Sequence, residues 1–66
     1  MTPEEYSTAV DAAVVIADGF FQEGPIDWDD LLYRLEEWTG IDLPDQMDDP
    51  ELLRLMRDVR KIRRES

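Results

Sequence analysis

The chain has 66 residues, which suits one small domain that buries only about 60% of its unfolded surface. It contains no cysteine and no histidine, which excludes disulfides, thiol chemistry, the usual zinc sites and histidine-based catalysis. The formal net charge of −10 disfavours nucleic acid as a partner of the whole domain and favours a basic protein surface.

The charge is unevenly distributed along this single domain, residues 1–66. Residues 1–53 hold fifteen acidic residues and one base, Arg34, whereas residues 54–66 hold six bases and two acids. No apolar run approaches the roughly 18 residues of a membrane span, and the start of the chain lacks the pattern of a secretory signal. We therefore expect a cytoplasmic protein with no membrane contact.

The first helix is predicted over about residues 3–22. Thr2 is a good N-cap, Pro3 suits the first helical position, and Glu5 completes a capping box. Gly19 could end this helix or lie inside it, and Gly24-Pro25 is the firmer stop signal. Continuation to about Gln22 is favoured because the helical phase would then point Phe20 and Phe21 inward. The remaining residues of this apolar face are Tyr6, Ala9, Val10, Ala13, Val14, Ile16 and Ala17.

Val15 falls on the opposite side of this helix, away from the apolar face. With Ala12 beside it, Val15 would form a small flat apolar spot, which points weakly to self-association.

The central helix is predicted over about residues 28–39. Asp27 is the N-cap candidate, and Gly40 can take the left-handed conformation that ends a helix. At 100° per residue one side is apolar and is expected to face the core. That side consists of Trp28, Leu31, Leu32, Leu35 and Trp38.

The opposite side of the central helix carries four carboxylates around one aromatic ring. Its residues are Asp29, Asp30, Tyr33, Glu36 and Glu37. Such a side can simply be solvated, but an exposed tyrosine ringed by acids is also a plausible anchor for a basic partner. We take these five residues as the predicted partner-binding surface.

The segment from Asp42 to Asp49 is rich in carboxylates. Leu43 precedes Pro44 and should be extended, while Leu43 and Met47 are expected to fold over the core. An EF-hand loop needs a central glycine and a closing glutamate at fixed spacing, and neither is present here. We expect no metal site and no cofactor.

The last helix is predicted over about residues 50–64, with Asp49 as its cap and Pro50 in first position. Its apolar stripe is Leu52, Leu55, Met56, Val59 and Ile62. The opposite, basic stripe is Arg54, Arg57, Lys61 and Arg64. These bases can compensate the helix dipole, or they can contact phosphates or the acidic helix of a second copy, which would make a homodimer.

Three amphipathic helices in one short chain predict an all-α fold, a small three-helix bundle of the up-down kind. A nucleophile beside a base, a phosphate-binding glycine loop and a pocket that separates two carboxyl pKa values are not evident. We therefore expect a protein that is not an enzyme.

The run DLLYRLEEWTGIDLPD resembles the second helix and following loop of acyl carrier proteins, which have the pattern ELxxxLEExFGIxIPD. In that family an Asp-Ser-Leu motif before the helix carries phosphopantetheine on its serine. Here Gly24-Pro25-Ile26 occupies that position, so the resemblance implies a carrier-like helical domain without the modifiable serine. It also implies recognition through an acidic helix.

These patterns favour a non-enzymatic protein–protein interaction module, a regulator or inhibitor that docks on a basic surface. A mimic of nucleic acid that occupies a DNA- or RNA-binding protein is an alternative reading of the same charge. Direct nucleic-acid binding is not expected, because the ten residues from Gly40 to Asp49 exceed the short turn of a helix-turn-helix motif.

Overall fold

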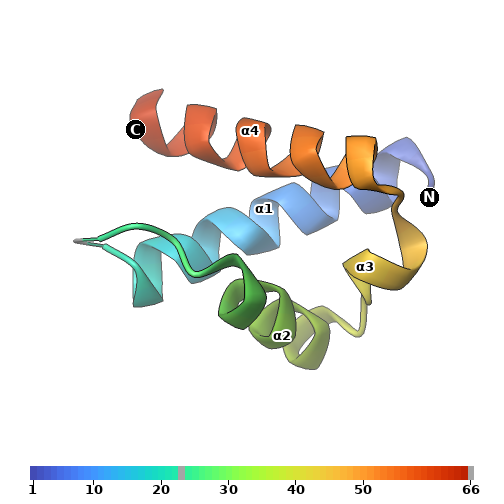
Figure 1. The fold of residues 1–66 in the computed structure, drawn as a ribbon, viewed down its shortest axis with the longest axis horizontal. Helices are drawn as coiled ribbons and strands as arrows, with labels where there is room; N and C mark the ends of the chain where they lie inside the picture. Colours follow the sequence, from blue (N-terminus) through green and yellow to red (C-terminus); the bar gives the residue numbers. More distant parts are fainter. Residues whose placement is uncertain (23, 66) are drawn as a thin grey trace.

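Helix α1 (Pro3–Phe20) lies between the two other long helices, α2 (Trp28–Thr39) and α4 (Asp49–Glu65), and both pack on it (Figure 1). A short helix, α3 (Leu43–Gln46), joins α2 to α4. The computed structural model describes residues 1–22 and 24–65, and within these ranges all regular structure is helical. The prediction of a small all-α bundle is confirmed.

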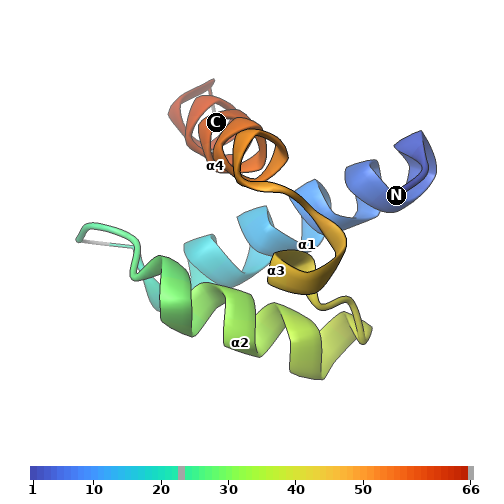
Figure 2. The same cartoon turned by 45° about the vertical axis from the view of Figure 1, so that its right-hand side comes forward.

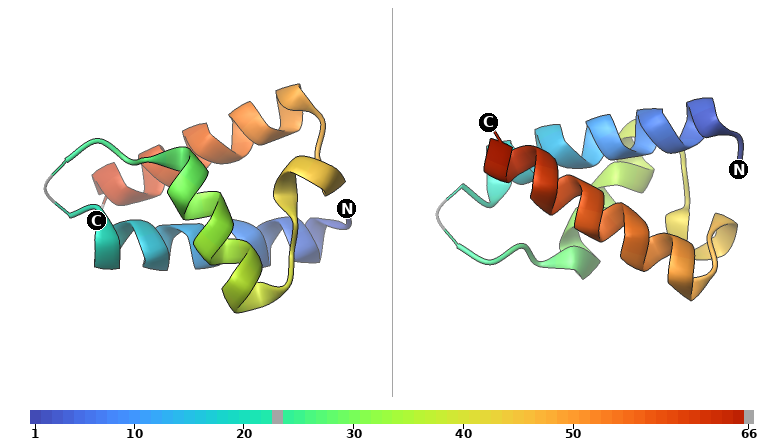
Figure 3. Two further views of the ribbon diagram at one scale, coloured as in Figure 1. Left: turned by 60° about the horizontal axis from the view of Figure 1, so that its bottom comes forward. Right: turned by 90° about the horizontal axis from the view of Figure 1, so that it is seen from above.

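The three long helices are not aligned side by side. Helices α1 and α4 run in the same general direction, from right to left in Figure 1, with α4 lying obliquely across α1 (Figure 3, right). Helix α2 crosses the middle of α1 at a steep angle (Figure 3, left). Figure 2, which views α4 almost end on, shows α1 between α4 and α2. The outer faces of α2 and α4 therefore point to opposite sides of the molecule.

The core forms on both sides of α1. Because α1 is covered by α2 and by α4, an unusually wide arc of it is buried, and four of its six buried residues are alanines that allow close approach. These six are Ala9, Val10, Ala12, Ala13, Ile16 and Ala17. The other buried residues are Leu31, Leu35, Leu43, Met47, Leu55 and Val59. Leu43 and Met47 thus cover the core as predicted.

Local capping explains where α1 and α2 begin and end. The Thr2 hydroxyl accepts the backbone N–H of Glu5 at 3.2 Å, and the Glu5 carboxylate accepts the N–H of Thr2 at 3.3 Å, which completes the predicted capping box. Asp27 caps α2, and Gly40 ends it in the left-handed conformation with φ of 77°. The predicted bounds of the central helix, 28–39, are confirmed.

The end of α1 differs from the prediction. The helix contains Gly19 but ends at Phe20, before Gln22, and the N–H of Phe21 bonds to the carbonyl of Ala17 at 2.9 Å. Phe21 packs against the core as predicted, whereas the prediction for Phe20 is wrong, because its side chain is 60% exposed. Helix α2 crosses the middle of α1 (Figure 3, left), so the last turn of α1 lies beyond the crossing.

The prediction of an exposed apolar spot formed by Ala12 and Val15 is also wrong. Val15 is exposed as predicted, but Ala12 is buried, because the arc of α1 covered by its two neighbours extends as far as Ala12.

The connection between α2 and α4 is more helical than expected. Leu43 begins α3 instead of being extended, and the Asp42 carboxylate accepts the N–H of Asp45 at 3.4 Å. A helical turn places Leu43 and Met47 four residues apart on one face, so both reach the core. Asp48, rather than Asp49, caps α4 by accepting the N–H of Glu51 at 3.0 Å. Along α4, burial is complete at Leu55 and Val59 but falls off towards the C-terminus, where Ile62 is 37% exposed.

Candidate partner-binding surfaces

A shallow acidic hollow lies on the outer side of α2. Asp29, Tyr33 and Glu36 recur at helical spacing on one face of α2, and the turn after Gly40 brings Asp42 and Pro44 beside them. This acidic hollow, of about 190 Å³, is lined by Asp29, Leu32, Tyr33, Glu36, Asp42 and Pro44. Three carboxylates thus surround one aromatic ring and two smaller apolar side chains.

Tyr33 is the most exposed of the large hydrophobic side chains of α2, at 61% of its full surface. Hydrogen bonding to Glu37 and the negative charge of Glu37 are the main causes that raise the pKa of the Tyr33 hydroxyl above its usual value. The hydroxyl therefore stays protonated at neutral pH and serves as a donor, while the ring remains accessible to a partner.

The structure separates the five residues predicted as one surface into two groups. Asp29, Tyr33 and Glu36 line the acidic hollow, whereas Asp30 and Glu37 do not. The carboxylate of Asp30 lies 3.2 Å from Nε of Arg34, an approach without hydrogen-bond geometry, so the attraction between them is electrostatic. At 40% side-chain exposure of Arg34 and 39% of Asp30, such a pair adds little to stability.

Glu37 belongs to a second depression, between α1 and α2. This aromatic groove, of about 290 Å³, is lined by Ile16, Phe20, Arg34, Glu37 and Trp38. The Arg34 guanidinium carbon lies 4.0 Å from the centroid of the Phe20 ring, a cation–π contact. The groove therefore combines two aromatic rings with one charge of each sign.

Trp38 was expected in the core, and that prediction is wrong, because the side chain is 59% exposed. Trp38 lies in the last turn of α2, and the C-terminal end of α2 extends beyond α1 (Figure 3, left). Leu35 and Leu31, one and two turns earlier, are fully buried as predicted.

The predicted basic stripe of α4 is exposed, and three of its four residues line one hollow. The Arg54 guanidinium carbon lies 5.4 Å from the centroid of the Tyr6 ring, at the N-terminal end of α4. The other three join Arg60, which sequence reasoning omitted, around a hollow of about 460 Å³. We call this the basic face: Arg57, Arg60, Lys61 and Arg64.

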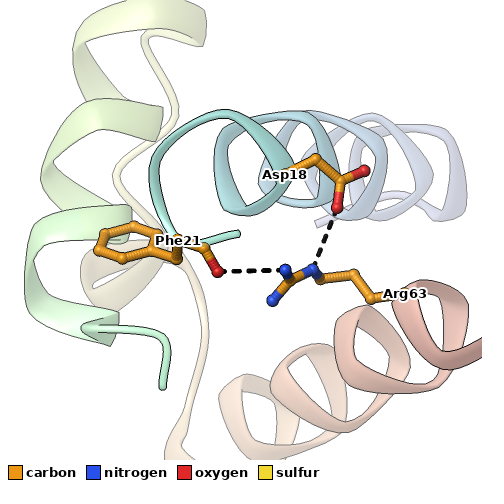
Figure 4. A network of polar contacts seen from close by, with 3 residues as sticks. All are labelled: Asp18, Phe21 and Arg63. Carbon is orange, nitrogen blue, oxygen red and sulfur yellow. Dashed lines mark hydrogen bonds and ion pairs between the residues drawn. The ribbon is translucent and has the colours of Figure 1, made fainter. Parts of the chain in front are cut away.

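Arg63 has a structural role at the C-terminal end of the bundle. Its Nε donates to Asp18 and its Nη2 donates to the backbone carbonyl of Phe21, both at 3.1 Å (Figure 4). Because Arg63 satisfies a carbonyl just beyond the last turn of α1, it fastens α4 to α1 and is not part of the basic face.

Sequence reasoning missed Phe20 and Trp38 of the aromatic groove, which it expected in the core, and it also missed Asp42, Pro44 and Arg60. Asp42 starts a D-x-x-D pattern two residues after Gly40, and this is a helix-start signal that could have placed Asp42. Arg60 is displaced from the 3-4-3 spacing of the basic stripe, so the stripe alone did not include it.

In the part of the chain that the structure describes, no group of three acidic side chains is placed to hold a metal ion, and no helix is long and apolar enough to cross a membrane. Comparison with known protein families, with curated proteins and with solved structures finds no match for this chain.

Proposed function

We propose that this protein is a non-enzymatic interaction module that docks its acidic hollow on a basic surface of another protein. The observation that carries the proposal is the exposed Tyr33 ring with the carboxylates of Asp29, Glu36 and Asp42 around it. An aromatic anchor within a charged rim is the usual composition of an interaction hot spot.

The chemistry of the hollow favours an arginine-bearing partner. A guanidinium can stack on the Tyr33 ring while its N–H groups reach a carboxylate, whereas a lysine ammonium offers only a point charge. Among the ion pairs formed by the described residues, none includes Asp29, Glu36 or Asp42. Asp29 and Glu36 are thus available to a partner without breaking an internal ion pair, whereas one oxygen of Asp42 already accepts the N–H of Asp45.

The test is a single charge reversal with a matched control. Glu36→Lys and Asp11→Lys change the net charge equally, but only Glu36 lines the acidic hollow, whereas Asp11 is exposed on α1. Wild-type protein and both variants are used to capture partners from cell extract, and the captured proteins are compared by mass spectrometry. We expect a basic partner that the wild type and Asp11→Lys retain and Glu36→Lys loses.

The affinity of that partner is then measured at two salt concentrations. We expect Glu36→Lys to weaken binding by about tenfold or more and to reduce its salt dependence, and Asp11→Lys to change it by less than about threefold. Equal affinity and equal salt dependence for the two variants would refute the proposed docking surface. Displacement of the partner by DNA or RNA would indicate that the hollow occupies a nucleic-acid site.

A further inference from the structure

The aromatic groove is chemically different from the acidic hollow, although α2 contributes to both. At 100° per residue, the α2 residues of the hollow are centred about 140° from those of the groove, and the buried side of α2 lies about 90° from the groove and about 130° from the hollow. The groove carries two of the most exposed large hydrophobic side chains of the protein, Phe20 at 60% and Trp38 at 59%. Two such rings lining one depression are typical of a protein interface.

The charges in the groove limit what can cover it. Arg34 is the only base in residues 1–53, and it lines the groove together with Glu37. A basic partner would place a positive charge against Arg34, and an acidic partner would place a negative charge against Glu37. A second copy of the same groove, turned by a two-fold rotation, offers a glutamate to Arg34 and an arginine to Glu37.

We propose that the aromatic groove is the interface of a symmetric homodimer. In the dimer the Phe20 and Trp38 rings of the two copies pack together at the centre. Arg34 of each copy pairs with Glu37 of the partner subunit, so the contact is made twice. This dimer uses neither the basic face nor Val15, and it leaves the acidic hollow on another side of α2.

Two features of the chain support a second copy as the occupant. A 66-residue domain has a small core of its own, and association is a common source of additional stability for chains of this size. The net charge of −10 makes the copies repel one another. A contact that pairs opposite charges reduces this repulsion, and the groove offers such a pair in Arg34 and Glu37.

The first test is the association state of the 66-residue chain. Sedimentation equilibrium from about 1 μM to about 1 mM, in about 0.15 M salt to screen the net charge, covers the Kd values expected of such a contact. We expect a monomer–dimer equilibrium for the wild type, and monomers for Phe20→Ser and Trp38→Ser at the same concentrations. Both side chains are exposed in the single chain, so circular dichroism should show unchanged helicity. A wild type that stays monomeric throughout this range overturns the proposal and leaves the groove to a different protein.

The second test exploits the reciprocity of a symmetric contact. Arg34→Glu places a carboxylate against Glu37 of the partner subunit, and Glu37→Arg places a guanidinium against Arg34 of the partner subunit. We expect each single reversal to weaken dimerisation by about tenfold or more, because like charges then meet twice. Mixing the two variants restores both pairs in a heterodimer, and the double variant with both reversals restores them in a homodimer.

Glu36→Arg is the matched control for Glu37→Arg, because it changes the adjacent side chain by the same charge but lies in the acidic hollow. It should leave dimerisation unchanged. Dimers of wild-type affinity from either single reversal, or a mixture that fails to restore dimerisation, overturns the proposal. Loss of partner binding in Glu36→Lys with dimerisation intact would separate this interface from the proposed docking surface.

Discussion

At the scale of single residues, the Tyr6 hydroxyl forms the closest polar link between α1 and α4. It donates to Oδ2 of Asp58 at 2.5 Å, a contact between residues 52 positions apart in the chain. Burial, the hydrogen bond to Asp58 and the negative charge of Asp58 raise the pKa of Tyr6 to about 12, against 10.0 for an ordinary tyrosine, while Arg54 opposes the shift. The bond therefore stabilises the fold only while the hydroxyl keeps its proton.

This pKa shift predicts how Tyr6 contributes to stability as the pH changes. Tyr6 is protonated in the folded and unfolded states below about pH 10, and its contribution is lost as the pH rises through its folded pKa of about 12. We expect Tyr6→Phe to be less stable than the wild type at pH 8, and the difference to shrink at about pH 11. Urea unfolding of both proteins at the two pH values measures this difference in the free energy of unfolding.

Asp58→Asn provides the control, because it removes the charge that raises the pKa of Tyr6 while keeping a hydrogen-bond acceptor. The wild type should again lose more stability than this variant on going to high pH. A difference between wild type and Tyr6→Phe that is equal at both pH values would contradict the role assigned to this bond.

At the scale of elements, Gly19 and Gly40 differ in whether the local backbone conformation requires a glycine. Gly19 lies inside α1, and Gly40 ends α2 with a φ of 77°. An added Cβ would meet no other atom within 4 Å at either position, so only the backbone decides the effect of a substitution. Gly19→Ala should stabilise the protein by about 0.5–1 kcal/mol through helix propensity.

Gly40→Ala should destabilise the protein by about 1 kcal/mol or more, because a side chain is strained in the left-handed conformation. Chemical denaturation of the two variants beside the wild type measures both effects, and each glycine serves as the control for the other. Effects of the same sign would contradict the conformations found at these two helix positions.

The starts and ends of helices could be predicted because they depend on neighbouring residues. Thr2 with Glu5, Asp27 and Gly40 act as expected, since each contact spans no more than four positions in the chain. The prediction of an extended Leu43 was wrong, because Leu43 begins helix α3. Burial of the Leu43 side chain and capping by Asp42 outweigh the preference of a residue before proline for extended geometry.

The surfaces of α2 were only partly predictable. Helical periodicity divides a helix into an apolar and a polar side, and this division correctly separated Leu31 and Leu35 from Tyr33. It could not show that α2 has three faces, with Glu37 and Trp38 together in the aromatic groove. That division follows from the steep crossing of α1 and α2, which depends on how side chains far apart in sequence pack.

At the scale of the whole molecule, the fold places acidic and basic side chains on separate surfaces. The acidic hollow lies on α2 and the basic face on α4, and α1 stands between them (Figure 1). Because the two surfaces lie on different helices, they can engage different partners, and each depends on α1 for its position. Helices α4 and α2 also meet directly at one point, where the Arg60 guanidinium carbon lies 5.4 Å from the centroid of the Trp28 ring.

The dependence of both outer helices on α1 predicts the effect of enlarging its centre. Ala13 is completely buried in the middle of the arc that α1 presents to α2 and α4. Ala13→Leu must push at least one of these helices away, and we expect a loss of about 1–3 kcal/mol in the free energy of unfolding. Val15→Leu adds bulk at a 56% exposed position of the same helix and should change stability by less than about 0.5 kcal/mol. Equal stability of the two variants in urea unfolding would contradict the close packing of α1, because an interior that accepts three additional carbon atoms without cost cannot be tightly filled.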